Sequence, residues 1–246
     1  MCLLLFASSV CFGADVKQVL TRAGLVEREM PAGDAWRLAN RNPVDYVVTD
    51  HAGQLAVTEQ RNFRRPPSVN VPFHGKSLLG TNNGEWGGTL SVVDTDGTAT
   101  VLVPDNVVQL LPEQDALFAF TGLAHLGSDR GAVYRIADQD GQVTAQKLTL
   151  LPGAPAVVTA ERNDRGYLAF LVVTTDGLVS FNPTYSEMKV LAIDQFWHGL
   201  YPNSTVLLDG QLVIGMRSGV AVISLAQVIG SGSRIRKLQY FSKPAP

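Results

Sequence analysis

The chain has little cysteine: only Cys2 and Cys11 occur among its 246 residues. Both lie in the segment 1–14, which is apolar and ends in small residues before the polar Asp15. Such a segment is typical of a secretory signal peptide, so we expect residues 1–14 to be removed and 15–246 to form the mature chain. The mature protein would then contain neither disulfides nor thiolate metal sites.

Long hydrophobic runs are also missing. The apolar stretch at the start of the chain is too short to cross a bilayer as a helix, so we expect a periplasmic or secreted protein with no integral membrane span. A lipid anchor on Cys11 is an alternative, although the preceding Ser-Ser-Val lacks the leucine and small residue that usually come before such a cysteine.

Excess charge of one sign is absent as well. The 20 Lys and Arg residues nearly balance the 22 Asp and Glu residues, which gives a formal net charge of −2. Because phosphate neutralisation needs a basic surface, we expect no nucleic-acid partner. One basic cluster, Arg61, Arg64 and Arg65, lies in a proline-flanked segment, and we interpret it as a solvated loop.

Several catalytic and metal-binding motifs do not occur. The sequence has no His-x-His, His-Glu-x-x-His or Cys-x-x-Cys spacing, no Gly-x-Ser-x-Gly elbow, and no Gly-x-Gly-x-x-Gly segment between a strand and a helix. We therefore expect no metal and no cofactor.

What the sequence does contain is a repeat. Turns rich in aspartate and glycine follow apolar runs, and Gly53, Gly97 and Gly141 are each 44 residues apart. A period of 40 to 50 residues with several short β-rich runs per unit is typical of a β-propeller, in which each unit is a four-stranded blade. The sequence therefore predicts an all-β fold, a single β-propeller domain of five four-stranded blades of about 44 residues.

The predicted strands follow the alternation of β-branched or aromatic runs with Gly, Pro, Asn and Asp. For the five blades they are 25–29, 35–39, 44–49 and 55–60; 69–73, 77–81, 89–94 and 98–103; 107–111, 116–121, 132–137 and 142–150; 156–161, 167–173, 178–182 and 188–193; and 204–208, 211–216, 220–225 and 235–241. Helical spacing is absent except at 16–22, which argues against a helical repeat. A β-sandwich or long β-barrel is the alternative fold, but neither requires a 44-residue register.

Blade geometry separates the loops into two rims. Second-to-third-strand loops and between-blade loops share one rim, and the Asp-Gly turns fall on the other. The first rim holds most of the chemically distinctive residues, and we predict that the ligand-binding site includes Asn82, Asn83, Glu85, Trp86, His125, Asp129, Arg130, Trp197 and His198.

Among these residues, the segment 82–88 has the most side chains suited to ligand binding. Its asparagines and Glu85 can form several hydrogen bonds with a polyhydroxylated ligand, and Trp86 provides a flat stacking surface. Trp86 could instead fill the space between blades, with the glycines merely forming a tight turn. For His125, an interior histidine bonded to a loop carbonyl is an equally ordinary role.

The segments Asn83–Gly88, Gly122–Leu126 and Asp129–Gly131 resemble those of exported bacterial β-propeller proteins, which are largely uncharacterised. Five-bladed propellers include sugar-binding lectins and glycosidases, so the resemblance leaves both binding and catalysis open. This chain lacks the near-identical binding loops of the lectins and the aspartates that begin the inner strands of the glycosidases.

Two main hypotheses follow. In the first, the chain is an exported monomer that binds a glycan, a peptide or a protein partner on one rim. In the second, it is a hydrolase acting on saccharides, with Glu85 as acid or base and His125 and Arg130 as stabilisers. A third possibility is a subunit with a purely structural role in an assembly. Glycosidases need two carboxylates about 5 to 10 Å apart, and no spacing in the sequence marks such a pair.

Overall fold

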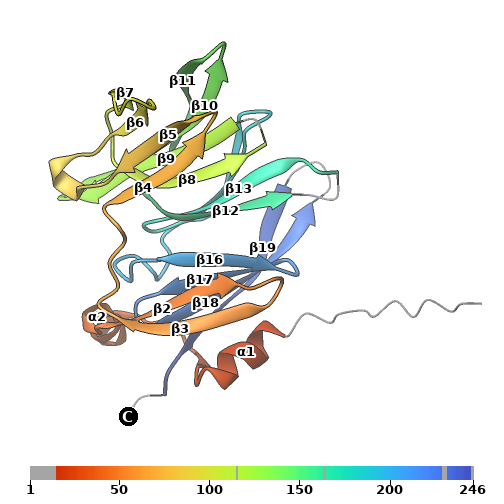
Figure 1. The fold of residues 1–246 in the computed structure, drawn as a ribbon. Coiled ribbons are helices and arrows are strands. Elements are labelled where there is room, and N and C mark those ends of the chain that lie inside the picture. Colours follow the sequence, from red (N-terminus) through yellow and green to blue (C-terminus); the bar gives the residue numbers. More distant parts are fainter. Residues whose placement is uncertain (1–14, 115, 163–164, 229–231, 245–246) are drawn as a thin grey trace, which may run out of the picture.

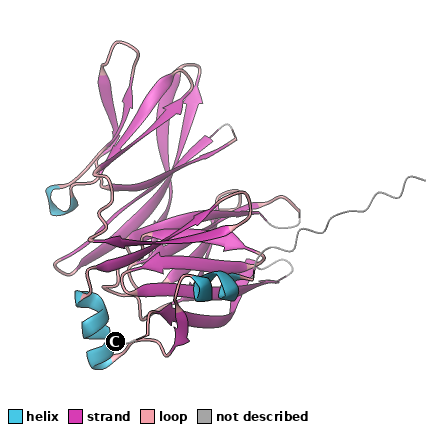
Figure 2. Ribbon diagram, turned by 60° about the horizontal axis from the view of Figure 1, so that its bottom comes forward, coloured by secondary structure: helices cyan, strands magenta, loops and turns pink. Residues whose placement is uncertain are grey.

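The computed structural model describes residues 15–114, 116–162, 165–228 and 232–244, so the signal peptide predicted at 1–14 lies outside the described residues. Strands make up most of this part of the chain, and the helices are short (Figure 2). Helix α1 is Val16–Arg22, α2 is Gly33–Arg41, and η1, Gly84–Trp86, is one turn of 3-10 helix. The prediction of an all-β protein is confirmed.

The described strands form antiparallel sheets that follow one another along the chain (Figure 1). Sheet 1 is a hairpin of β2 (Val44–Asp50) and β3 (Leu55–Arg61). Sheet 2 contains β4 (Ser68–Phe73), β5 (Lys76–Thr81), β6 (Leu90–Val93) and β7 (Ala99–Val103). Sheet 3 contains β8 (Val107–Glu113), β9 (Ala116–His125), β10 (Ser128–Gln139) and β11 (Gln142–Leu151).

Sheet 4 contains β12 (Pro155–Arg162), β13 (Leu168–Thr174), β14 (Leu178–Asn182) and β15 (Glu187–Ala192). Sheet 5 contains β16 (Ser204–Leu208), β17 (Gln211–Met216), β18 (Gly219–Val228), β19 (Gly232–Ser242) and, from the start of the chain, β1 (Val26–Arg28). Sheets 2 to 4 have the predicted four strands. Five four-stranded blades are not confirmed, because sheet 1 has two strands and sheet 5 has five.

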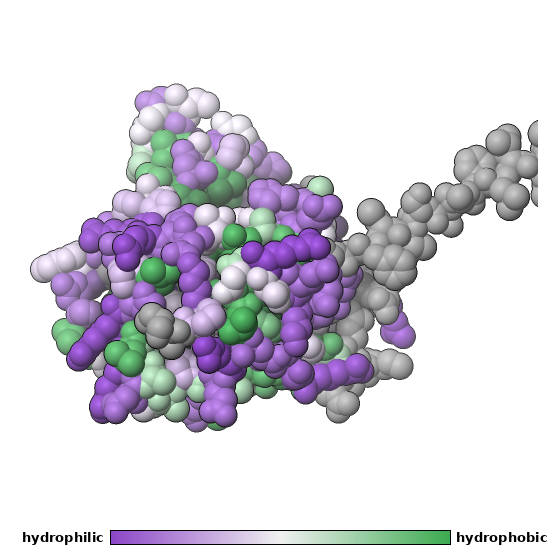
Figure 3. All heavy atoms as spheres, turned by 90° about the horizontal axis from the view of Figure 1, so that it is seen from below, coloured by the Kyte–Doolittle hydropathy of each residue, from purple (hydrophilic) through white to green (hydrophobic). Residues whose placement is uncertain are grey.

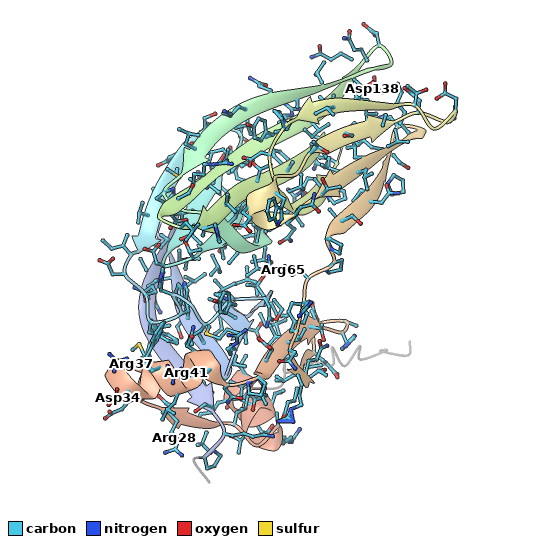
Figure 4. All side chains as sticks on the ribbon, turned by 90° about the vertical axis from the view of Figure 1, so that its left-hand side faces the viewer. Arg28, Asp34, Arg37, Arg41, Arg65 and Asp138 are labelled. Atoms are coloured by element: carbon cyan, nitrogen blue, oxygen red, sulfur yellow. The ribbon has the colours of Figure 1, made fainter. Side chains whose placement is uncertain are left out.

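The inner strands, β2, β4, β8, β12 and β16, lie around a central cavity of about 690 Å³. Along this arc β8 contacts β4 and β12, while β16 contacts β12 and β2. The segment 62–67 joins the two ends of the arc by connecting β3 to β4, and it also lines the cavity (Figure 4). The arrangement is that of a β-propeller-like fold.

The hydrophobic core lies between neighbouring sheets. Between sheets 3 and 4, Phe118 and Phe120 of β9 pack against Phe170 of β13, and the Phe120 and Phe170 rings meet edge to face with centroids 5.1 Å apart. This is the favoured geometry for two aromatic rings. Because each sheet buries its faces against its neighbours, the sheets stabilise one another.

Helix α1 lies against sheets 1 and 5. The chain begins the helix at Asp15, whose carboxylate accepts a hydrogen bond from the backbone nitrogen of Lys17. Val16 and Leu20, four residues apart on one helix face, are buried with Leu55 of β3 and Phe241 of β19. Strand β1 then pairs with β19, so segments from near both ends of the described chain share sheet 5.

Two details of the predicted first blade are wrong. The predicted strand 35–39 lies in α2, where Asp34 in the first turn and Arg41 in the last complement the helix dipole and Pro43 follows the end. The predicted strand 25–29 is found as β1, but it pairs with sheet 5 instead of sheet 1.

Gly53 and Gly97, which are 44 residues apart, lie in turns at different positions of their sheets. Gly97 and Gly141 lie between the third and fourth strands of sheets 2 and 3, whereas Gly53 follows an inner strand, β2. Both kinds of turn need a left-handed residue, and Gly53 and Gly97 have φ values of 81° and 85°. Similar turn chemistry therefore produced an apparent register between different positions in the fold.

Figure 3 shows the molecule from below the view of Figure 1, and the face seen there is mostly hydrophilic. Apolar residues appear there in small separate groups, as on an ordinary protein surface.

Candidate functional site

The segment 82–88 forms a short, ordered projection between β5 and β6. Asn82 Oδ1 accepts a hydrogen bond from the backbone nitrogen of Gly84 at 3.1 Å, and η1 follows. Gly84 and Gly87 have φ values of 61° and 83°, which side chains with a Cβ rarely adopt. This turn leaves Trp86 84% exposed, the reverse of the usual burial of tryptophan.

The buried side-chain amide of Asn106 fixes the backbone of this projection by hydrogen bonds. Asn106, which is 1% exposed, donates from Nδ2 to the carbonyl oxygen of Gly84 at 2.8 Å and accepts at Oδ1 from the backbone nitrogen of Asn83 at 3.2 Å. Gly88 lies so close that a Cβ there would be 2.7 Å from Asn106 Oδ1. Sequence reasoning missed Asn106, since an asparagine after Asp105 in a loop looks like an ordinary solvated turn residue.

Glu85 and His125 meet on this rim. Glu85 Oε2 lies 2.7 Å from His125 Nε2, and the two side chains are 45% and 41% exposed. His125 ends β9 at a two-residue turn, Leu126 and Gly127, whose φ values are both positive, as tight hairpins require. The turn directs the chain straight back into β10 and places the imidazole beside η1. The structure thus brings together Glu85, Trp86 and His125, which we name the rim cluster.

Arg130 is part of the support beneath the rim cluster. Its Nη1 donates to Asp105 Oδ2 at 2.7 Å, and this hydrogen bond raises the pKa of Arg130 above its usual value. Asp105 also accepts from Thr121 and from the backbone nitrogen of Asn106. Arg130 therefore connects through Asp105 and Asn106 to the loop that carries Glu85.

Asp129 joins sheet 3 to sheet 4. Its two carboxylate oxygens accept from the backbone nitrogen of Ala154 at 2.6 Å and from the Thr175 hydroxyl at 2.8 Å. Both oxygens are thus engaged with the next sheet, and Asp129 is not part of the rim cluster.

Trp197 and His198 have unlike environments. Trp197 is fully buried, and its Nε1 donates to the carbonyl oxygen of Thr174 at 3.2 Å, so it offers no surface to a ligand. His198 is exposed, and its own carbonyl oxygen accepts from Trp36 Nε1 of α2 at 2.9 Å. Helix α2 therefore covers the loop that contains these two residues, on the same side of the molecule as η1 (Figure 1).

In the described ranges, no three His, Cys, Asp or Glu side chains gather closely enough to hold a metal ion. The same part of the chain contains no helix with the length and apolar character needed to cross a membrane.

No family model and no curated protein matches the chain. Among solved structures, a luciferin-regenerating enzyme aligns over 85% of this chain and 80% of its own, with 12% identity and a TM-score of 0.43. The extracellular domain of a one-component system from B. thetaiotaomicron aligns with 12% identity and a TM-score of 0.40 over 82% of this chain, which spans about a third (32%) of that protein. The designed protein Ika8 aligns with 13% identity over 72% of this chain and 70% of its own, with a TM-score of 0.32. These TM-scores are all below 0.5, and the β-propeller-like arrangement is defined by the strand pairing and by the contacts between sheets.

Proposed function

We propose that the chain is an exported β-propeller protein that binds a glycan at the rim cluster of Glu85, Trp86 and His125. The observation that carries the proposal is Trp86, 84% exposed on a turn whose backbone is fixed by a buried asparagine. The apolar face of a sugar ring can stack on a flat aromatic side chain that is free of the core.

The neighbouring polar groups fit the same ligand class. Glu85 and His125 lie side by side and are both partly exposed, so sugar hydroxyls can reach a carboxylate and an imidazole together. A contact between two partly exposed polar side chains, even when both are charged, contributes only about 0–1 kcal/mol to stability. The fold therefore gains little from Glu85, Trp86 or His125, which favours a role in binding.

Rigidity of the loop also supports binding. Asn106 bonds to the backbone of the consecutive residues Asn83 and Gly84 at the start of the turn, and Arg130 with Asp105 holds Asn106 in place. A loop that is ordered before the ligand arrives loses less conformational entropy on binding.

The hydrolase alternative has less support. Retaining and inverting glycosidases both need a second carboxylate close to the first. The nearby acids Asp105 and Asp129 are engaged with Arg130 and with Ala154 and Thr175, respectively. Arg130, offered as a stabiliser beside Glu85, forms its ion pair with Asp105.

A glycan-array screen tests the proposal, with the wild-type chain beside Trp86→Ala. Tyr185→Ala is the matched control, because Tyr185 is an exposed aromatic (61%) in the turn between β14 and β15 on the opposite rim. We expect a glycan signal that Trp86→Ala abolishes and Tyr185→Ala retains. A signal that survives Trp86→Ala, or no signal with a folded protein, would reject the glycan site and favour a peptide or protein partner.

Glu85→Gln separates binding from catalysis. In a binding site the amide keeps an acceptor, so affinity should fall only modestly. If the bound glycan were hydrolysed by the wild type, and Glu85→Gln bound it but did not cleave it, the hydrolase hypothesis would replace the binding one.

A further inference from the structure

The central cavity does not include Glu85, Trp86 or His125, and its chemistry differs from that of the rim cluster. Its walls come from the inner strands, from the segment 62–67 and from Asn82, and its volume of about 690 Å³ falls in the usual range for small-molecule sites. Much of the lining is apolar. Val69, Val108, Pro66 and Pro67 keep part of their surface open, whereas Val48, Val107 and Val157 are packed in the hydrophobic core. Among the described residues that line it, Arg65 alone carries a charge.

Arg65 is directed into the space between the sheets from the segment that joins sheets 1 and 2 (Figure 4). Its side chain keeps access to solvent within the cavity, but protein atoms surround the guanidinium, and this burial lowers the pKa of Arg65 to about 10. The guanidinium therefore stays protonated at neutral pH. The segment is exposed, as the sequence suggests, and Arg65 lines the cavity from it.

The guanidinium is only partly used by the protein. Nη2 donates to the carbonyl oxygen of Pro202 at 2.7 Å, and no ion pair joins Arg65 to a carboxylate among the described residues. A guanidinium has five N–H donors, so several remain for a ligand.

The backbone holds Arg65 in place. Pro66 and Pro67 fix their own φ angles and restrict Arg65 to extended conformations. On one side of the segment the backbone nitrogen of Phe63 donates to Asp45, and on the other the carbonyl oxygen of Pro67 accepts from Asn82. The position of the cation is therefore set before a ligand enters.

Several other polar groups on the walls have partners within the protein. The amide of Gln109 bonds to both backbone groups of Val158, and the Ser204 hydroxyl bonds to Val48 and Asn203. Asn203 Nδ2 has no hydrogen-bond partner in the described structure, but this atom is shielded from solvent. The charged recognition group of the cavity is thus Arg65.

From this geometry we propose that the central cavity is a second binding site, for a carboxylate with an apolar body, in which Arg65 binds the carboxylate and the open apolar lining, which includes Val69 and Val108, contacts the apolar part. The planar fork of arginine matches the two oxygens of a carboxylate, and the charge-assisted bonds strengthen in a partly desolvated site. Nothing in this proposal depends on the rim cluster.

Isothermal titration calorimetry with hexanoate, octanoate and 1-octanol tests the proposal on the full chain. We expect octanoate to bind roughly tenfold more tightly than hexanoate, as two additional buried methylene groups imply, and 1-octanol to bind at least tenfold more weakly than octanoate. Equal binding of octanoate and 1-octanol, no octanoate binding, or equally tight binding of inorganic phosphate would overturn it.

Two cavity substitutions and one control test whether octanoate binds in the central cavity. Arg65→Met should weaken octanoate at least tenfold, whereas Arg64→Met, a neighbouring arginine outside the cavity lining, should change it less than twofold. Val108→Phe reduces the space in the cavity and keeps Arg65, so it should also weaken octanoate binding. This variant tests the site if Arg65→Met does not fold. Unchanged octanoate affinity in either folded cavity variant would contradict the proposal.

Discussion

Gln109 and Val158 join the inner strands of neighbouring sheets. The side chain of Gln109 on β8 donates from Nε2 to the carbonyl oxygen of Val158 on β12 at 2.8 Å and accepts at Oε1 from the Val158 backbone nitrogen at 2.9 Å. A side-chain amide thus takes the place of a strand partner where β12 has no neighbouring strand in its own sheet. Ser204 has a similar role between sheets 5 and 1, because its hydroxyl accepts from the backbone nitrogen of Val48.

We expect Gln109→Leu to lower the free energy of unfolding by about 1–3 kcal/mol, because it leaves both backbone groups of buried Val158 without partners. Gln146→Leu on the exposed outer strand β11 is the matched control and should change stability by less than about 0.5 kcal/mol. Urea unfolding of the three proteins measures the difference. Equal stability of Gln109→Leu and Gln146→Leu would mean that this link contributes nothing.

Asn106→Ala should destabilise the chain by about 1–3 kcal/mol and free the segment 82–88, since the hydrogen bonds to Asn83 and Gly84 are both lost. Amide hydrogen exchange at Asn83 should accelerate in the variant. Asn182→Ala removes an asparagine from an exposed turn on the opposite rim and should leave exchange at Asn83 unchanged. Unaltered exchange in Asn106→Ala would refute the role given to this amide.

Asp45 gives a pH dependence. Burial raises the pKa of its carboxyl above the ordinary 3.8, despite the hydrogen bond from Phe63 and the charge of Arg217. Between 3.8 and the higher folded-state pKa, the folded chain binds more protons than the unfolded chain, so this carboxyl makes the protein less stable as pH rises through that window.

The change can be isolated with Asp45→Asn, which does not titrate. The stability of the wild type minus that of Asp45→Asn should fall as pH increases from 3.8 upward and become constant once Asp45 is ionised in both states. Thermal unfolding in steps of pH measures this difference. A difference that rises with pH in this window would show that attraction to Arg217 outweighs burial.

Leu20→Ala should cost about 2–5 kcal/mol, because Leu20 is fully buried between α1, sheet 1 and sheet 5. Gln18→Ala lies on the exposed face of the same helix and should have little effect. Calorimetric melting of both variants tests whether α1 is an integral part of the fold. Similar melting of the two would show that the helix is not.

The parts of the fold that local chemistry specifies could be predicted from the sequence. Apolar runs bounded by Asp-Gly turns located the strands of sheets 2 to 4, since alternation and turn geometry are encoded within a few residues. In the first blade the strands 44–49 and 55–60 are present as β2 and β3. The strand predicted at 35–39 is wrong because the apolar residues of α2 also fit a short strand, and Gly53 matches the spacing of an unrelated turn.

The environment of single side chains was less predictable. The sequence places both Trp86 and Trp197 in connections between strands. In the structure Trp86 is exposed, whereas Trp197 is fully buried. Asn106 and Arg65 lie in loops, as the sequence suggests. The contact of Asn106 with Gly84 of η1 and the position of Arg65 at the cavity depend on the packing of distant segments, which the sequence does not reveal. Sequence patterns encode local structure, whereas burial depends on contacts between sheets.

The most direct measurement is iodide quenching of tryptophan fluorescence during titration with a glycan identified on the array. Of the three tryptophans, Trp86 is 84% exposed, Trp36 is half-buried and Trp197 is fully buried, so Trp86 should dominate the quenching. If the glycan stacks on Trp86, saturation should suppress quenching in the wild type and leave the small residual quenching of Trp86→Ala unchanged. Unchanged quenching of the wild type at saturating glycan would contradict binding at the rim cluster.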